Sequence, residues 1–158
     1  MKPKLSALIY FCLVKAGKQL GRTLVATGAT GQTPSRLFYV SDNNTHTRFL
    51  IDTGSEVSVI PPSRSDRRSP PDKLTLTAVN NTPISTFGKR SLTLDLGLRR
   101  SFPWVFLVAD VQRPILGADF LRHFGLLVNM KQRQLSDTAT QLHVQGILTT
   151  EPSPSPTL

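Results

Sequence analysis

Short apolar stretches separated by polar turns recur through the middle of this chain, a pattern typical of β-strands. Residues 74–79 and 91–96 alternate apolar and polar side chains, whereas 102–109 is almost continuously apolar. Strands are expected at 37–40, 45–51, 57–60, 74–79, 84–87, 91–96, 102–109, 126–129 and 134–135. The sequence therefore predicts an all-β fold.

One short helix is expected near residues 119–124, after an apolar pair and a glycine. Asp119 has the short acceptor side chain that helix N-caps prefer. Gly125 follows the predicted helix, where a glycine commonly ends a helix. Residues 80–83, Asn-Asn-Thr-Pro, are typical of a turn, so they predict the exposed tip of a hairpin between two strands.

Composition divides the chain into three parts. Residues 34–137 carry the strand pattern, and the length suits one domain with one core. Residues 1–33 are expected to be an N-terminal appendage or linker, disordered in part, because the stretch TGATGQTPS at 27–35 is linker-like. Residues 138–158 are expected to be a largely disordered tail, since the chain ends in EPSPSPTL.

The first residues imitate a secretion signal, with a basic start followed by an apolar stretch at 5–14. That stretch is too short to span a bilayer, and Lys15 directly follows it. We therefore expect no membrane partner, and we favour an intracellular protein over secretion through residues 1–17.

The formal net charge of +9 over 158 residues raises the question of an anionic partner. The basic side chains are scattered beside turns, whereas nucleic-acid binders usually gather them on one face. A solvated basic surface is the favoured interpretation, and nucleic-acid binding is the alternative. The single cysteine, Cys12, excludes an internal disulfide, and the three histidines lack ligand spacing. Neither a metal site nor a cofactor is expected.

The stretch FLIDTGSEVSVIP at 49–61 puts a carboxylate, Asp52, in a small polar turn between two apolar strands. A buried carboxylate is unfavourable unless it is paired, hydrogen-bonded or neutralised. The triplet Asp-Thr-Gly is short enough to occur by chance, so its context carries the interpretation. A second apolar pair with a glycine follows in ILGADF at 115–120, and the predicted hairpin lies between the two stretches.

Three stretches, LIDTGSEVSVIP, AVNNTPISTFG and PILGADFLRHFGLLV, resemble the retropepsin family in order and spacing. These are the aspartic proteases (peptidase A2 type) of retroviruses and of Ty3/gypsy-type retrotransposons. The resemblance covers residues 36–136 and is closest to the protease segment of retrotransposon Gag-Pol polyproteins. It implies a closed β-barrel protomer, a two-fold homodimer, and a place in the cytoplasm or in a virus-like particle.

The chemistry of aspartic proteases leads to the same dimer. It needs two carboxylates that are too close for both to be ionised, so that they hold one proton between them. The chain has one Asp-Thr-Gly, and neither Asp110 nor Asp119 lies in such a turn. The second carboxylate is therefore expected from Asp52 of a second copy across a two-fold axis.

The resemblance implies roles for the residues around Asp52. One Asp52 would act as general base on a water, and the protonated one would polarise the scissile carbonyl. Thr53 would hydrogen-bond to the partner's turn, and Gly54 would donate its N–H to the carboxylate. Ser55 would donate a further hydrogen bond to the ionised carboxylate. Leu116 and Gly117 would pack behind the turn as active-site support.

The hairpin tip is expected to act as a flap that closes over a peptide and excludes water. Its residues are Val79, Asn80, Asn81, Thr82, Pro83 and Ile84. Candidate walls of the substrate pocket are Ile60, Ile84, Val108 and Ile115, each of which could equally be plain core.

The expected partners are a second copy of the chain and a peptide or polyprotein substrate. Two other interpretations stay open. The domain could keep the fold without the activity, as a catalytically silent retroelement-derived segment, or it could bind nucleic acid or a protein through its basic surface.

Overall fold

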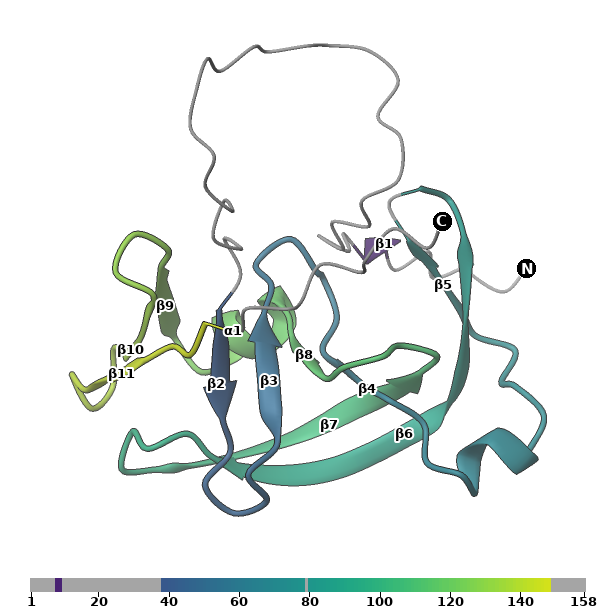
Figure 1. The fold of residues 1–158 in the computed structure, drawn as a ribbon, viewed down its shortest axis with the longest axis horizontal. Coiled ribbons are helices and arrows are strands. Elements are labelled where there is room, and N and C mark those ends of the chain that lie inside the picture. Colours follow the sequence, from purple (N-terminus) through teal and green to yellow (C-terminus); the bar gives the residue numbers. More distant parts are fainter. Residues whose placement is uncertain (1–7, 10–37, 79, 149–158) are drawn as a thin grey trace, which may run out of the picture.

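The structure is a computed structural model, and it describes residues 8–9, 38–78 and 80–148 (Figure 1). The strands are β1 (Leu8–Ile9), β2 (Tyr39–Ser41), β3 (Arg48–Ile51), β4 (Val59–Ile60), β5 (Thr75–Ala78), β6 (Pro83–Asp95), β7 (Ser101–Ala109), β8 (Ile115–Leu116), β9 (Leu126–Asn129), β10 (Gln134–Asp137) and β11 (His143–Gln145). The helices are the 3-10 turn η1 (Asp66–Arg68) and α1 (Ala118–His123). The prediction of an all-β fold with a short helix near 119–124 is confirmed.

The strands form two sheets. The larger sheet has the order β1-β5-β6-β7-β4-β8-β3-β2, and the smaller has the order β11-β10-β9. In the larger sheet β3 pairs with β8 in parallel, and so does β4 with β7, whereas β6 and β7 form a long antiparallel pair. In Figure 1 that long pair curves beneath β2, β3 and β4.

Strand β6 joins two segments that the sequence predicted as separate strands, 84–87 and 91–96. The pairing with β7 shifts between Thr86 and Lys89, which marks a bulge. Gly88 lies in this bulge at φ +92°, a conformation that glycine adopts without strain. The polar stretch at 88–90 therefore marks a bend within one strand and not the end of a strand.

Two clusters of buried side chains lie on opposite faces of the central strands. The first cluster is built around Phe38, Val40, Phe49, Ile51, Ile60, Leu94, Leu96, Leu98, Phe102, Phe106, Val108, Leu116, Phe120, Leu121, Leu126 and Leu135. The second cluster is built around Tyr39, Leu50, Val59, Leu76, Leu107, Ala109, Val111 and Ile115. Neighbouring residues of one strand alternate between the clusters because side chains of a strand point to opposite faces.

Helix α1 starts one residue earlier than expected and its cap differs from the prediction. Its N-cap is Gly117, and no side chain caps it. Asp119, predicted as the cap, lies in the first turn and accepts hydrogen bonds from Ser58, in the loop just before β4. Phe120 and Leu121 are buried in the first cluster, which fixes the helix against the sheet. Within the described part of the chain, no helix is long and apolar enough to cross a membrane.

The small sheet differs from the boundary expected at residue 137. The predicted strand pair at its centre, β9 with β10, is confirmed. Strand β11 adds a third strand antiparallel to β10, and Tyr39 and Ile147 exchange backbone hydrogen bonds of 3.0 and 2.7 Å. Residues 138–148 are therefore ordered, contrary to the predicted tail. The remaining tail and most of the predicted appendage, residues 1–7, 10–37 and 149–158, lie outside the described residues.

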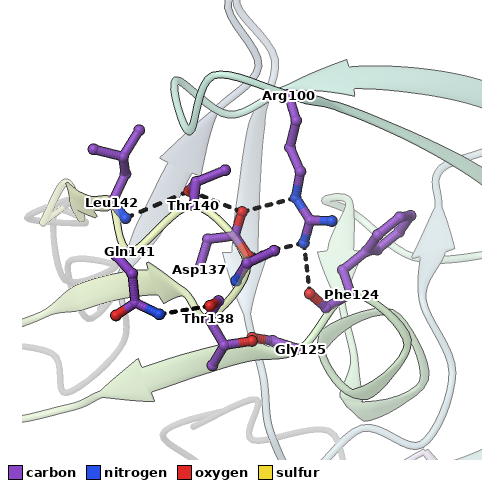
Figure 2. A network of polar contacts seen from close by, with 9 residues as sticks. Arg100, Phe124, Gly125, Asp137, Thr138, Thr140, Gln141 and Leu142 are labelled. Atoms are coloured by element: carbon purple, nitrogen blue, oxygen red, sulfur yellow. Dashed lines mark hydrogen bonds and ion pairs between the residues drawn. The ribbon is translucent and has the colours of Figure 1, made fainter.

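An ion pair between the buried Asp137 and the partly exposed Arg100 holds the turn before β11 (Figure 2). The Arg100 guanidinium approaches Asp137 through Nε at 2.7 Å from Oδ2 and through Nη2 at 2.9 Å from Oδ1. Burial alone would raise the pKa of Asp137, but hydrogen bonds from the Ala139 amide and the Thr140 hydroxyl, together with Arg100, outweigh it and lower the pKa. Polar residues at 138–141 resemble a loose loop by composition, yet here they satisfy a buried carboxylate.

Candidate active site

Asp52 lies where β3 ends, and β3 lies between β8 and the edge strand β2 in the larger sheet. In the parallel pair, Leu50 is opposite Ile115 and Ile51 is opposite Leu116. The Asp52 amide continues this ladder by donating to the Leu116 carbonyl oxygen at 3.1 Å. Asp52 as a whole residue is 6% exposed. The sequence therefore holds a carboxylate at the end of two buried strands, where the backbone around it is fixed.

The turn after Asp52 donates to the carboxylate. The Gly54 amide donates to Asp52 Oδ1 at 3.0 Å, and the Ser55 amide donates to the Asp52 carbonyl oxygen at 3.2 Å. Such a turn is typical of aspartate, whose short side chain accepts from the backbone two residues on. Thr53 and Gly54 are exposed beside the buried carboxylate. One face of the turn is therefore open to a ligand or to another protein chain.

Ser55 makes a different contact from the one expected. Its hydroxyl donates to the Val57 carbonyl oxygen at 2.8 Å, so its one proton is directed there and not to Asp52. The residue is fully buried beneath the turn. A buried carbonyl needs a donor, and the Ser55 hydroxyl supplies it within the same loop.

Gly117 lies where the loop that follows Asp52 contacts β8 and α1. A Cβ at this position would be 2.7 Å from the Ser55 carbonyl oxygen and 2.9 Å from the carbonyl group of Val57. The neighbouring Ala118 amide donates to that same Ser55 oxygen at 2.7 Å. Leu116 is fully buried in the first cluster. This contact of backbone with backbone leaves room for glycine alone.

Ser58 and Asp119 also join this loop to the start of α1, a pairing that was not predicted from the sequence. Asp119 Oδ1 accepts from the Ser58 hydroxyl at 2.7 Å, and Oδ2 accepts from the Ser58 amide at 3.1 Å. The Ser58 oxygen in turn accepts from the Gly117 amide at 2.8 Å. A polar residue inside the apolar stretch VSVI was the one signal available, because it needs a buried partner.

The predicted flap is the turn between β5 and β6. The Ala78 amide donates to the Thr82 carbonyl oxygen at 2.9 Å, and the Asn81 amide donates to the Ala78 carbonyl oxygen at 2.9 Å. Asn81 adopts φ +61°, which asparagine tolerates. Residues 80–83 are exposed and Ile84 is half-buried against the second cluster. Val79, the first predicted flap residue, lies outside the described residues.

The four candidate pocket walls divide between the two clusters. Ile115 belongs to the second cluster, and Ile84 packs against that cluster. Ile60 and Val108 are register partners in the first cluster, on the other face. Their neighbours Val59 and Leu107 take the positions in the second cluster, because a shift of one residue changes the face.

The Asp52 side chain and the predicted flap lie on the same face of the larger sheet. Leu50 belongs to the second cluster, and Asp52 lies two residues further along the same ladder. Its side chain therefore leaves β3 on the face of the second cluster, against which Ile84 also packs. Among the described residues, no group of three or more His, Cys, Asp or Glu side chains could hold a metal ion.

No protein-family model matches the sequence, and no curated protein is a significant match. Among solved structures, the retroviral protease-like domain of Ddi1 from Leishmania major aligns with a TM-score of 0.53 at 19% identity, covering 73% of this chain and 98% of that chain. The EIAV protease complexed with the inhibitor HBY-793 aligns with a TM-score of 0.42 at 25% identity. That alignment covers 63% of this chain and 95% of the EIAV chain. The fold is retropepsin-like, as the likeness to the Ddi1 domain shows.

Proposed function

We propose that this chain is an aspartic endopeptidase that acts as a homodimer, with one Asp52 from each protomer. The observation that carries the proposal is the Asp52 carboxylate, nearly buried at the end of a parallel strand pair and held by the Gly54 amide. The retropepsin-like fold supports it as well.

The need for a dimer follows from the reaction. Peptide hydrolysis by carboxylates requires one group to take a proton from water while another gives a proton to the scissile carbonyl. Two adjacent carboxylates meet both needs because they share one proton. The chain contains one Asp-Thr-Gly triplet, so a second copy related by a two-fold axis supplies the other. The exposed Thr53 is available to contact the partner's turn.

Hydrolysis is proposed to pass through a tetrahedral diol and to leave the two carboxylates as they began. The ionised Asp52 takes a proton from water as the water oxygen bonds to the carbonyl carbon, and the protonated Asp52 of the partner gives its proton to the carbonyl oxygen. The tetrahedral diol then breaks its C–N bond, and the nitrogen leaves with the proton taken from water. The carbonyl re-forms and returns the other proton to a carboxylate. This restores the dyad, the pair of Asp52 carboxylates that share one proton.

The residues around Asp52 position it for this chemistry. The Gly54 amide stabilises the carboxylate in one orientation, and the contact of Gly117 with the loop fixes the depth of the turn. The hairpin at 80–84 closes over the bound peptide and excludes water from the dyad. Half-buried Ile84 offers apolar surface to the substrate from the same face as Asp52, with the buried Ile115 in the cluster behind it.

We further propose a biological setting of retroelement polyprotein processing, in the cytoplasm or in a virus-like particle. The resemblance to the protease segment of Ty3/gypsy-type Gag-Pol polyproteins supports this setting. The substrate would then be an extended linker between the domains of a polyprotein. The basic surface would lie beside packaged RNA without being a binding site in its own right.

A peptide-cleavage assay tests the proposed activity. The full chain is incubated at mildly acidic pH with an apolar peptide library, next to Asp52→Asn and next to wild type with a pepstatin-type transition-state mimic. Cleavage that either change abolishes supports the aspartic mechanism. A folded wild-type protein that cleaves nothing at high concentration contradicts it and favours the silent binding domain.

A further inference from the structure

Arg113 and Tyr39 form a polar contact beside the second cluster. Arg113 Nη1 donates to the Tyr39 hydroxyl, and the guanidinium carbon lies 5.8 Å from the centroid of the Tyr39 ring. Tyr39 is 4% exposed, whereas Arg113 is half-buried. A cation that is fixed against an aromatic ring at the margin of an apolar cluster is positioned, and is not a freely moving surface charge.

The contact lies on the same face of the sheet as Asp52. Tyr39 is the register partner of Leu50, and both belong to the second cluster together with Ile115. The side chain of Asp52 leaves β3 on this same face, as the ladder requires. Standard strand spacings put the Tyr39 and Asp52 Cα atoms about 8 Å apart.

The pair faces the flap across the second cluster. Ile84 of the flap hairpin packs against the cluster on the β5–β6 side, and Tyr39 borders it on β2, at the other edge of the sheet. Figure 1 shows β2 and β3 side by side, with β5 and the beginning of β6 on the other side of the view. A peptide that lay over Asp52 on this face and extended towards β2 would pass the Tyr39–Arg113 contact.

We propose that Arg113, oriented by Tyr39, is a specificity-determining residue that makes the cleft prefer substrates with a carboxylate side chain close to the scissile bond. This inference rests on the proposed protease function, since it names the substrate class of that site.

The chemistry of the guanidinium supports the preference. Arginine stays charged at every working pH and matches a carboxylate with a planar fork of donors. The apolar surroundings and the closed flap lower the local dielectric, which strengthens the attraction to a substrate carboxylate. A neutral isostere such as glutamine keeps the size of glutamate and loses that attraction.

Two-fold symmetry extends the preference to both sides of the scissile bond. Each protomer of the proposed dimer contributes one Arg113, so the two cations lie symmetrically about the dyad. Acidic residues are then favoured at matching distances before and after the cleaved bond. Between them, apolar residues of the substrate pack on the half-buried Ile84 of each protomer.

The test compares matched glutamate and glutamine peptides, with the substitution placed in turn at each position flanking the scissile bond. Two quantities are measured: kcat/KM on the active protein, and peptide affinity on the Asp52→Asn background, where binding does not depend on cleavage. At the preferred positions the glutamate peptide should be favoured roughly tenfold, the ratio expected for one charge-assisted hydrogen bond.

Variants isolate the contribution of Arg113. Arg113→Gln should bring the glutamate-to-glutamine ratio to about one, and Tyr39→Phe should lower it in part, because the ring stays and the acceptor is lost. Arg122→Gln, which removes an equal charge from the exposed side of α1, should leave the ratio unchanged. Thermal unfolding of each variant checks that it folds.

A ratio that survives both Arg113→Gln and Tyr39→Phe overturns the inference, whether it is measured in kcat/KM or in affinity. Loss of cleavage in wild type is a separate result. In that case the proposed protease function fails, while an Arg113-dependent preference in affinity still supports the acidic subsite.

Discussion

Asp119 holds Ser58 with both of its carboxylate oxygens, one accepting from the hydroxyl at 2.7 Å and the other from the amide at 3.1 Å. Because Ser58 also accepts from the Gly117 amide, the three residues join the loop after Asp52 to the start of α1. The depth and orientation of the proposed catalytic turn therefore depend on a side chain far away in sequence.

Asp119→Ala is expected to destabilise the fold by about 2–4 kcal/mol, because it leaves two buried donors of Ser58 without an acceptor. Urea unfolding measures this loss. Asp110→Ala is the matched control, since Asp110 forms an exposed ion pair with Arg67 and its removal should change stability by less than about 1 kcal/mol. Equal effects of the two substitutions would refute the structural role of Asp119.

Gly117→Ala is expected to reduce both stability and cleavage. The added Cβ would meet backbone atoms of Ser55 and Val57, which cannot rotate away as a flexible side chain could. Overpacking of this kind costs about 1–3 kcal/mol and would displace the turn that holds Asp52. Thermal unfolding and kcat/KM measure the two effects. A variant with wild-type stability and activity would show that the loop yields without consequence.

Ser55→Ala is expected to cost about 1 kcal/mol of stability, because the Val57 carbonyl oxygen loses its donor. The shape of the pH–rate profile should stay unchanged, since the hydroxyl is directed away from the Asp52 carboxylate. The measurement is kcat/KM against pH for the two proteins. A shift of the acidic limb would mean that Ser55 contacts the carboxylate during catalysis.

Asp137→Asn is expected to destabilise the protein at neutral pH by about 3 kcal/mol, because Arg100 is left beside a neutral group. The pKa of Asp137 is lowered in the folded state, so its carboxylate stabilises the fold above its ordinary pKa of 3.8, and this contribution is lost as pH falls below that value. Urea unfolding at several acidic pH values should therefore show a weaker pH dependence for Asp137→Asn than for wild type. Identical slopes would contradict this role.

The sequence predicted what depends on local pattern and failed where distant residues meet. Alternation located most strands, and the Asp-Thr-Gly turn identified the candidate carboxylate. Strand β6 was predicted as two strands because Gly88, Lys89 and Arg90 resemble a strand end. A bulge within a strand and the end of a strand have similar composition. Asp119 was mistaken for a cap because its partner, Ser58, is 61 residues away.

The sequence pattern also could not predict which cluster each side chain of a strand would join. Ile60 and Val108 are apolar, as residues of a substrate pocket wall commonly are. In the register of β4 with β7, however, their side chains lie on the face of the first cluster. Strand β11 was missed because the turn before it is polar. Its order depends on Arg100, which comes from another part of the chain.

The most direct test of the central claim is a subunit-mixing experiment. Wild type and Asp52→Asn are unfolded together in equal amounts, refolded, and assayed at constant total protein concentration. If each active site needs Asp52 from both protomers, random pairing leaves about one quarter of the activity of pure wild type. Activity of about one half would show that each chain works alone, and would contradict the shared dyad.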